Sequence, residues 1–326
     1  MAILLPLLAV VLGLAALVWS ADRFVDGAAA SARLLGVPAL LVGMVVVGFG
    51  TSAPELTVSA ISAWRGNSSI ALGNAWGSNI CNIGLILGVA AAISPLAIRR
   101  EALRFDLPIL FGTTILSWPL LADDTLSRAD AIVLLAAFAA WLLASIRRAV
   151  RGGRAPELAS ANAPGVALSG RMAAFWTVAG LVVLVVSSRV LVWGAVELAQ
   201  ALGVSDLVIG LTVVAVGTSL PELASSVVAV RKGVDDLAVG NVIGSNLFNT
   251  LAVVGLAGAI RPMEAIDPAV CERDVSWAFC LTGILLLLLP FPSAKAGERR
   301  IERPGGLLLL VVYAAYLVKL VLAAAK

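Results

Sequence analysis

The chain has 326 residues, of which 60% are hydrophobic and 13% are charged, whereas soluble domains average about 45–50% apolar and about 25% charged residues. This composition excludes an ordinary soluble protein. The net charge of +3 does not indicate nucleic-acid binding, because most charged residues flank apolar segments, and the absence of histidine from the sequence excludes the Ser/His and HExxH sites of hydrolytic enzymes.

Ten apolar windows follow one another along the chain, each close to the roughly 20 residues that a bilayer-spanning helix needs. They lie at 2–20, 38–63, 70–95, 105–121, 130–146, 173–196, 206–230, 237–260, 275–291 and 306–324. The first window lacks the basic flank of a secretory signal, so we interpret it as a membrane span. The sequence therefore predicts an all-α polytopic membrane protein with ten transmembrane helices.

Basic residues alternate between the connections of these spans. They follow spans 1, 3, 5 and 7 and precede span 10, whereas the opposite loops carry acids such as Asp123 and Asp124. Because basic loops remain in the cytoplasm, we expect both termini on the extracellular or periplasmic side. The Arg-rich segment 148–171 is predicted to be a cytoplasmic linker between two five-helix repeats, residues 1–147 and 172–326.

An internal repeat relates the two halves. A shift of 167 positions aligns 36–88 with 203–255 without a gap, and 22 of the 53 aligned residues are identical. Since each half holds five spans, the second half enters the membrane from the opposite side. The sequence therefore predicts an inverted-topology repeat, an arrangement that places a transporter's substrate site near the membrane midplane between the halves.

The identical residues concentrate in two blocks per half. The pattern Gly-Thr-Ser-x-Pro-Glu occurs at 50–55 and again at 217–222, and a second block occurs at 73–82 and again at 240–249. Polar residues that repeat inside hydrophobic helices indicate that both halves need them for a shared site.

Glu55 and Glu222 lie well inside spans 2 and 7. A charged side chain at this depth costs at least about 2.5–3.5 kcal/mol, and such residues usually mark ion pathways. Neither span has a Lys or Arg at a comparable depth, which predicts a bound cation as their partner. The alternative is a pair of protonated or hydrogen-bonded glutamates between helices.

The prolines one residue before the glutamates, Pro54 and Pro221, have no N–H for the carbonyls of Gly50 and Gly217. We therefore predict broken helices whose freed carbonyls face a cavity. Hydroxyls three and four residues before each glutamate share its helical face, so every predicted ligand is an oxygen. Such a set suits Ca²⁺ or Na⁺, whereas Mg²⁺ needs a tight octahedron and soft metals need sulfur or imidazole.

The two repeated blocks resemble the alpha repeats of the calcium/cation antiporter superfamily, in its sodium/calcium exchanger branch. The resemblance implies a site between spans 2, 3, 7 and 8, and sliding of spans 1 and 6 across the other eight. It also implies a lining made of main-chain carbonyls near Gly48 and Ala215 together with the side chains of Thr51, Ser52, Glu55, Ser78, Asn82, Thr218, Ser219, Glu222, Ser245 and Asn249.

The expected function is antiport of Na⁺ against Ca²⁺ in a bacterial plasma membrane. The alternatives are an H⁺/Ca²⁺ or other divalent-cation antiporter and a cation channel. Some relatives, including potassium-dependent exchangers, carry Asp where this chain has Asn249, which argues against K⁺ co-transport. Ca²⁺ and Na⁺ are expected as transported ligands and the bilayer as the surroundings, with no cofactor, no nucleic acid and no obligatory protein partner.

Overall fold

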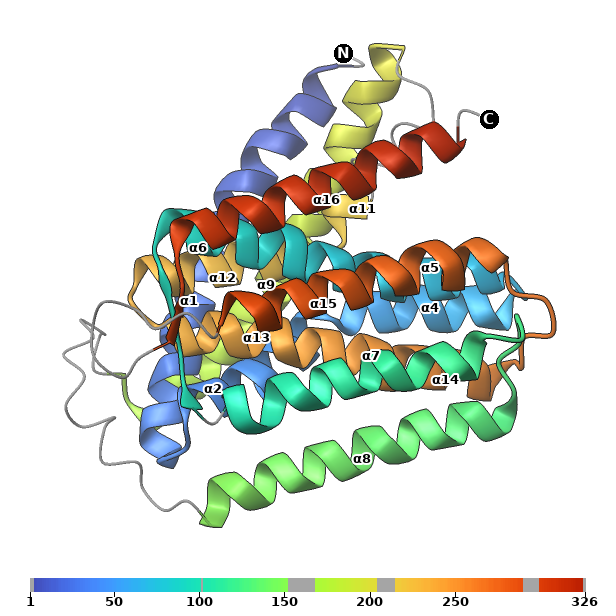
Figure 1. Cartoon of the computed structure of the whole chain (residues 1–326). Coiled ribbons are helices and arrows are strands. Elements are labelled where there is room, and N and C mark those ends of the chain that lie inside the picture. Colours follow the sequence, from blue (N-terminus) through green and yellow to red (C-terminus); the bar gives the residue numbers. More distant parts are fainter. Residues whose placement is uncertain (1–2, 101, 152–167, 204–214, 290–298, 325–326) are drawn as a thin grey trace.

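The computed structural model describes residues 3–100, 102–151, 168–203, 215–289 and 299–324 (Figure 1). Helices make up nearly all of the described part of the first half. They are α1 (Leu4–Leu35), α2 (Ala39–Val42), the π-helix η1 (Gly43–Val47), α3 (Gly48–Thr51), α4 (Ala53–Trp64), α5 (Ser68–Cys81), the π-helix η2 (Asn82–Leu87), α6 (Gly88–Ile93), the π-helix η3 (Ala102–Asp106), α7 (Leu107–Leu121) and α8 (Arg128–Arg151).

The second half repeats this order. Its elements are α9 (Gly170–Ala201), α11 (Ala215–Gly217), α12 (Leu220–Arg231), α13 (Asp235–Leu247), the π-helix η6 (Phe248–Val253), α14 (Val254–Ile260), the π-helix η7 (Val270–Val275), α15 (Ser276–Leu288) and α16 (Arg303–Ala324). Most of the predicted linker, 152–167, lies outside the described residues, as does 204–214, which includes the first part of predicted span 7.

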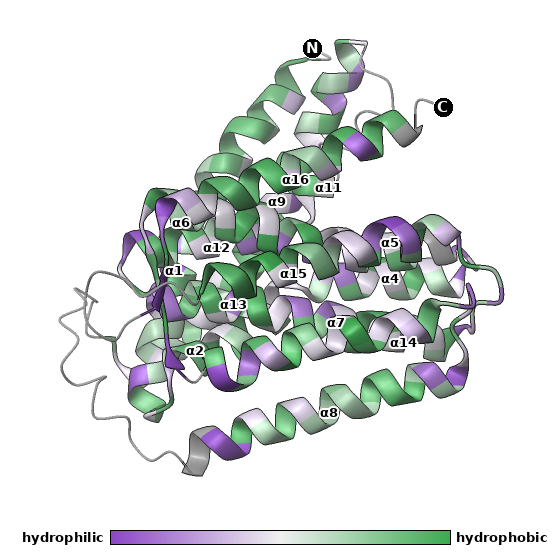
Figure 2. Ribbon diagram, viewed as in Figure 1, coloured by the Kyte–Doolittle hydropathy of each residue, from purple (hydrophilic) through white to green (hydrophobic). Residues whose placement is uncertain are grey.

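Hydrophobic residues run along the helices, and hydrophilic residues gather mainly at the ends of the bundle (Figure 2). In the described part of the chain, six continuous helical segments are long and apolar enough to cross a membrane: Leu4–Leu35, Ile70–Ile93, Arg128–Arg148, Gly170–Ala201, Asp235–Ile260 and Arg303–Leu322. A seventh, Ala39–Thr51 with Ala53–Trp64, is bent by 45°. The all-α membrane fold is confirmed, and the count of ten crossings stays a prediction.

The two longest helices, α1 and α9, lie side by side and cross the rest of the bundle obliquely (Figure 1). A Cβ atom on Gly13 would lie 2.9 Å from the main chain of Leu191, and one on Gly180 would lie 2.8 Å from that of Phe24. These two contacts are related by the sequence offset of the repeat, since 180 − 13 = 167 and 191 − 24 = 167. Glycine therefore allows the equivalent helices of the two halves to pack backbone to backbone.

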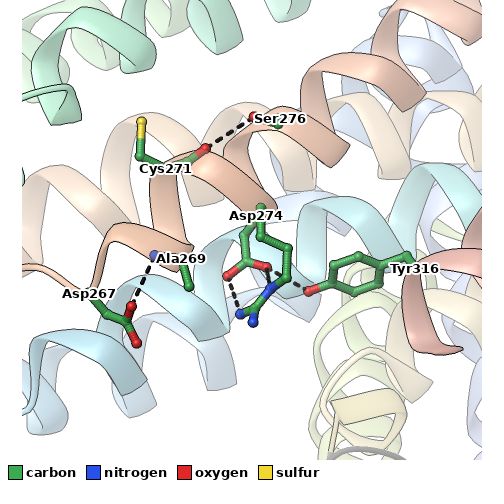
Figure 3. A network of polar contacts seen from close by, with 7 residues as sticks. Asp267, Ala269, Cys271, Asp274, Ser276 and Tyr316 are labelled. Atoms are coloured by element: carbon green, nitrogen blue, oxygen red, sulfur yellow. Dashed lines mark hydrogen bonds and ion pairs between the residues drawn. The ribbon is translucent and has the colours of Figure 1, made fainter. Parts of the chain in front are cut away.

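A buried carboxylate in each half anchors its last long helix. Asp106, at the end of η3, accepts a hydrogen bond from Arg148 Nη2 at 2.9 Å. Asp274, in η7, accepts one from the Tyr316 hydroxyl at 3.0 Å and is also held by the guanidinium of Arg273 (Figure 3). Arg148 was assigned to the linker from the sequence, but it lies inside α8 and belongs to this packing.

One short antiparallel pair of strands joins the halves at one end of the bundle. It is formed by β1 (Leu96–Ile98) and β2 (Arg299–Ile301), with Leu96 opposite Ile301. The pair cannot be predicted from the sequence, because three residues are too few to show a strand periodicity. The pair connects the end of α6 to the start of α16.

Candidate functional site

The helix is broken at the Gly-Thr-Ser-x-Pro-Glu pattern in both halves, as predicted. In the first half α3 ends at Thr51 and α4 begins at Ala53, with Ser52 at φ −85° and ψ 4° between them. In the second half α11 ends at Gly217 and α12 begins at Leu220. Proline at the second helical position explains where each new helix starts, because that position needs no N–H donor.

The freed carbonyl of Gly217 is satisfied by another helix. The hydroxyl of Ser188 in α9 donates a hydrogen bond to it at 3.2 Å. The equivalent position in α1 is Ala21, since 188 − 167 = 21, and alanine has no hydroxyl to donate to the Gly50 carbonyl. The two broken helices are therefore not equivalent. The carbonyl at the second break accepts a hydroxyl hydrogen bond from α9, whereas α1 has no hydroxyl at the equivalent position to donate to the first.

Opposite these breaks, the neighbouring helices change from α to π geometry. The π-helix η2 begins at Asn82, directly after α5, and η6 begins at Phe248, directly after α13, so that Asn249 is its second residue. Such π segments are rare and frequently occur at functional sites. Both predicted amide ligands thus stand at the same type of irregularity, which sequence patterns do not reveal.

Glu55 and Glu222 are each only 1% exposed. Neither Oε1 nor Oε2 of Glu55 has a hydrogen-bond partner, nor does Oε2 of Glu222. No ion pair found among the described residues involves either glutamate. An ionised group this deeply buried is costly unless a charge or a donor compensates it, and a bound cation is one partner that could compensate both carboxylates.

Hydroxyls from the first half reach the glutamate of the second. Ser52 Oγ donates to Glu222 Oε1 at 3.3 Å, and Thr51 also lies beside that carboxylate. Helical spacing alone predicts both hydroxyls next to Glu55, because it treats the helix as continuous past Ser52. The break at this residue turns the two side chains across the interface between the halves.

Further oxygen atoms of the predicted lining are buried and have no partner. They are Asn82 Oδ1, Ser219 Oγ and Asn249 Oδ1, and the Asn249 amide nitrogen is also without one. Ser78 lies beside the Glu55 carboxylate. In native structures nearly all buried polar atoms are hydrogen-bonded, so each of these exceptions calls for an explanation, and a ligand is one.

The other predicted lining residues are placed as follows. Ser245 Oγ donates to the Gly48 carbonyl at 3.3 Å, which also accepts the Ser52 N–H at 3.1 Å. Thr218 is half-buried between α11 and α12. Ala215 is the first residue of α11.

Two asparagines outside the lining predicted from the sequence hold the glutamates in place. Asn74 Nδ2 donates to the Glu55 carbonyl at 3.1 Å and to Ser59 Oγ at 2.9 Å. Asn241 Nδ2 donates to the Glu222 carbonyl at 3.2 Å and to the hydroxyl of Ser226, the equivalent of Ser59, at 2.9 Å. The only sequence signal for this role is that both asparagines belong to the repeated blocks.

Asn241 also links the halves, because Thr51 Oγ1 donates to its Oδ1 at 3.3 Å. In addition, Asn82 Nδ2 donates to Asn246 Oδ1 at 2.9 Å. Within the residues that the structure describes, no three His, Cys, Asp or Glu side chains gather around one point. The arrangement thus offers two carboxylates among neutral oxygens, a donor set for a hard cation with a modest charge.

Comparison with known proteins agrees with this geometry. The family model described as sodium/calcium exchanger protein matches residues 5–147 and 172–322, one segment in each half. CaxA of Alkalimonas amylolytica is 42% identical over 94% of this chain and 96% of its own length. The sodium/calcium exchanger MaX1 of Methanosarcina acetivorans is 32% identical over 96% of this chain and 97% of its own length.

Among solved structures, the sodium-calcium exchanger NCX_Mj matches with a TM-score of 0.81 and 31% identity, over 97% of this chain and 98% of that protein. The matches thus extend over nearly the whole length of the chain, and both broken helices lie within the segments that the family model covers. The chain is a multi-pass membrane transporter that belongs to the sodium/calcium exchanger family.

Proposed function

We propose that the protein is a secondary active antiporter that exchanges Na⁺ for Ca²⁺ by alternating access through a single site. The observation that carries the proposal is the pair of buried glutamates, which form no ion pair among the described residues, together with oxygen atoms of the predicted lining that are buried and have no hydrogen-bond partner. We assign the twelve residues implied by the sequence resemblance as the lining, and add Asn74 and Asn241 as positioning residues.

Charge balance explains why one site serves both ions in turn. Two carboxylates neutralise one Ca²⁺, or equally two Na⁺, and all the predicted ligands are oxygens that accept either ion. Mg²⁺ is less well matched, because it needs near-ideal octahedral geometry and gives up its waters reluctantly. Since the two cargoes compete for the same carboxylates, binding of one excludes the other, which is the minimum requirement for antiport.

We propose that the protein lies in a bacterial plasma membrane with both termini outside, an orientation that the distribution of basic residues among the loops supports. The connection between α12 and α13 would then be cytoplasmic, as would the segment between α8 and α9. The connection between α4 and α5 would lie on the extracellular side. The end of the bundle that carries the connection between α12 and α13 is therefore its cytoplasmic end, and the end that carries the connection between α4 and α5 is its extracellular end.

The direct test is Ca²⁺ uptake by the purified protein in proteoliposomes preloaded with Na⁺, K⁺, choline or acidic buffer. We expect rapid uptake only from the Na⁺-loaded vesicles, and none with choline inside and outside. Equal uptake from acid-loaded vesicles without Na⁺ would establish H⁺/Ca²⁺ antiport instead. Uptake that needs no counter-ion would establish a channel.

The asparagines that hold the glutamate carbonyls should affect transport without carrying cargo charge. We expect Asn74→Ala and Asn241→Ala to raise the Ca²⁺ concentration for half-maximal uptake about tenfold, because a buried hydrogen bond to the main chain contributes on the order of 1–1.5 kcal/mol. Asn67→Ala is the matched control, since Asn67 is exposed in the turn before α5. Unchanged uptake by both site variants would contradict a positioning role.

A further inference from the structure

One basic residue is bound by three acceptors on α1. Lys232, directly after α12, places its Nζ 2.8 Å from Asp22 Oδ1, 2.6 Å from Asp26 Oδ1 and 3.0 Å from the Asp22 carbonyl. An ammonium group has three N–H donors, so this contact satisfies all of them. The Lys232 side chain is 23% exposed and that of Asp26 is 16% exposed, so the cluster is partly shielded from water.

The repeat has no equivalent of this cluster in the other half. By the offset of 167, Lys232 corresponds to Arg65, Asp22 to Arg189 and Asp26 to Trp193. Arg65 and Arg189 are both exposed, and both are positively charged. No ion pair equivalent to the Lys232 contact can therefore form between these two positions in the other half.

Helix packing is also closer at the end of the molecule that holds the Lys232 cluster than at the opposite end. α1 packs along α12, whereas the equivalent helices α9 and α4, both fully described, make at most marginal contact. Ile61 of α4 is 48% exposed, while the equivalent Val228 of α12 is half-buried. Glu197 of α9 is exposed, while the equivalent Ala30 of α1 is only 2% exposed.

We propose that Lys232, Asp22 and Asp26 form an ionic latch that holds α1 against α12 and keeps this end of the transporter closed. The latch must break before the ion site can open toward this end, which the basic loops place in the cytoplasm. Because the opposite end lacks a counterpart, the latch biases the protein toward the conformation in which the cytoplasmic end is closed. The inference rests on the proposed alternating access, and it is independent of which cations are exchanged.

Paired cysteine reporters at equivalent positions test the latch. Ala29 follows Asp22 and Asp26 on one helical stripe of α1 and is buried, and its equivalent on α9 is Val196. Each is replaced by Cys in the full chain after Cys81, Cys271 and Cys280 are replaced by Ala. The rate of labelling by a methanethiosulfonate reagent is then measured in detergent, where the reagent reaches both ends.

We expect Lys232→Met to speed labelling of Ala29→Cys about tenfold and to slow labelling of Val196→Cys. Asp26→Asn should change both rates in the same directions. Lys232→Arg should keep the parent rates, because it keeps the charge. Arg65→Met, at the equivalent position without a latch, should leave both rates unchanged.

Rates that Lys232→Met and Asp26→Asn leave within twofold of the parent would overturn the latch. A simultaneous rise at both reporters would also overturn it, since it would indicate general loosening and not a shift between two states. The labelling does not depend on the cargo. If the parent protein showed no Na⁺-driven Ca²⁺ uptake, the exchange proposal would be refuted. The latch would still be tested by the labelling rates of Ala29→Cys and Val196→Cys, which must change in opposite directions.

Discussion

Replacing Glu55 or Glu222 by Gln is expected to lower Na⁺-driven Ca²⁺ uptake at least about 100-fold at sub-saturating Ca²⁺, which corresponds to about 2.7 kcal/mol. Glutamine has nearly the same shape, so each variant should keep the fold. It lacks the negative charge, however, and a divalent ion in a buried site would then face a single carboxylate. Loss of one partner of a buried charge pair is strongly unfavourable because the remaining charge is left uncompensated.

The matched control is Glu302→Gln, which removes a carboxylate that is exposed near the start of α16. It should transport like the parent. Initial Ca²⁺ uptake should be measured together with equilibrium Ca²⁺ binding, so that a loss of affinity is separated from a loss of turnover. If either purified glutamate variant kept more than a third of the parental rate, that glutamate would not be a ligand of the transported ion.

The sequence predicted the local features of the site well. Proline acts on the carbonyl four residues before it, so Pro54 and Pro221 were enough to locate both helix breaks. The glutamates were identifiable because their charge is exceptional inside an apolar span. Such effects depend only on neighbours along the chain, and the structure confirms the breaks at Ser52 and before Leu220.

Contacts between the halves were not predictable in the same way. Ser52 donates to Glu222 because the break redirects it across an interface of residues 170 positions apart in sequence. The partners of Asn241 and Asn246 likewise include residues of the first half. A repeat shows that these positions are needed in both halves, but it does not show which half each side chain serves.

Comparison of the repeats also concealed the latch. Lys232 and Arg65 look interchangeable in the alignment, whereas their surroundings differ because Asp22 corresponds to Arg189. The π-helices that begin at Asn82 and Phe248 cannot be recognised from the hydrophobic periodicity of the sequence. Their main-chain hydrogen bonds span five residues, whereas those of an α-helix span four, and this difference over a single turn leaves no pattern in the side chains. Departures from symmetry thus become visible only when both halves are placed in space.

Asn249→Asp should convert a site with two charges into one with three, and with it the ion dependence of transport. Asn249 is 0% exposed and neither of its amide atoms has a hydrogen-bond partner, and in the proposed lining a carboxylate there would join the two glutamates. With one Ca²⁺ bound, the proposed site of two glutamates would be neutral, and we expect transport by the parent to be independent of K⁺. The variant would retain one negative charge, which a further cation must neutralise in a site this dry.

We therefore expect Ca²⁺ uptake by the Asn249→Asp variant to require added K⁺ or protons. Uptake by the parent should require neither, and K⁺ or protons should affect it only by competing with Ca²⁺ for the carboxylates. The measurement is initial Ca²⁺ uptake against pH for both proteins, with and without K⁺, at equal Ca²⁺. Asn67→Asp is the control, because it adds the same charge in an exposed turn. If the curves of Asn249→Asp and the parent superimpose in both conditions, then Asn249 does not contribute to the ion site, and the lining assigned to η6 is wrong.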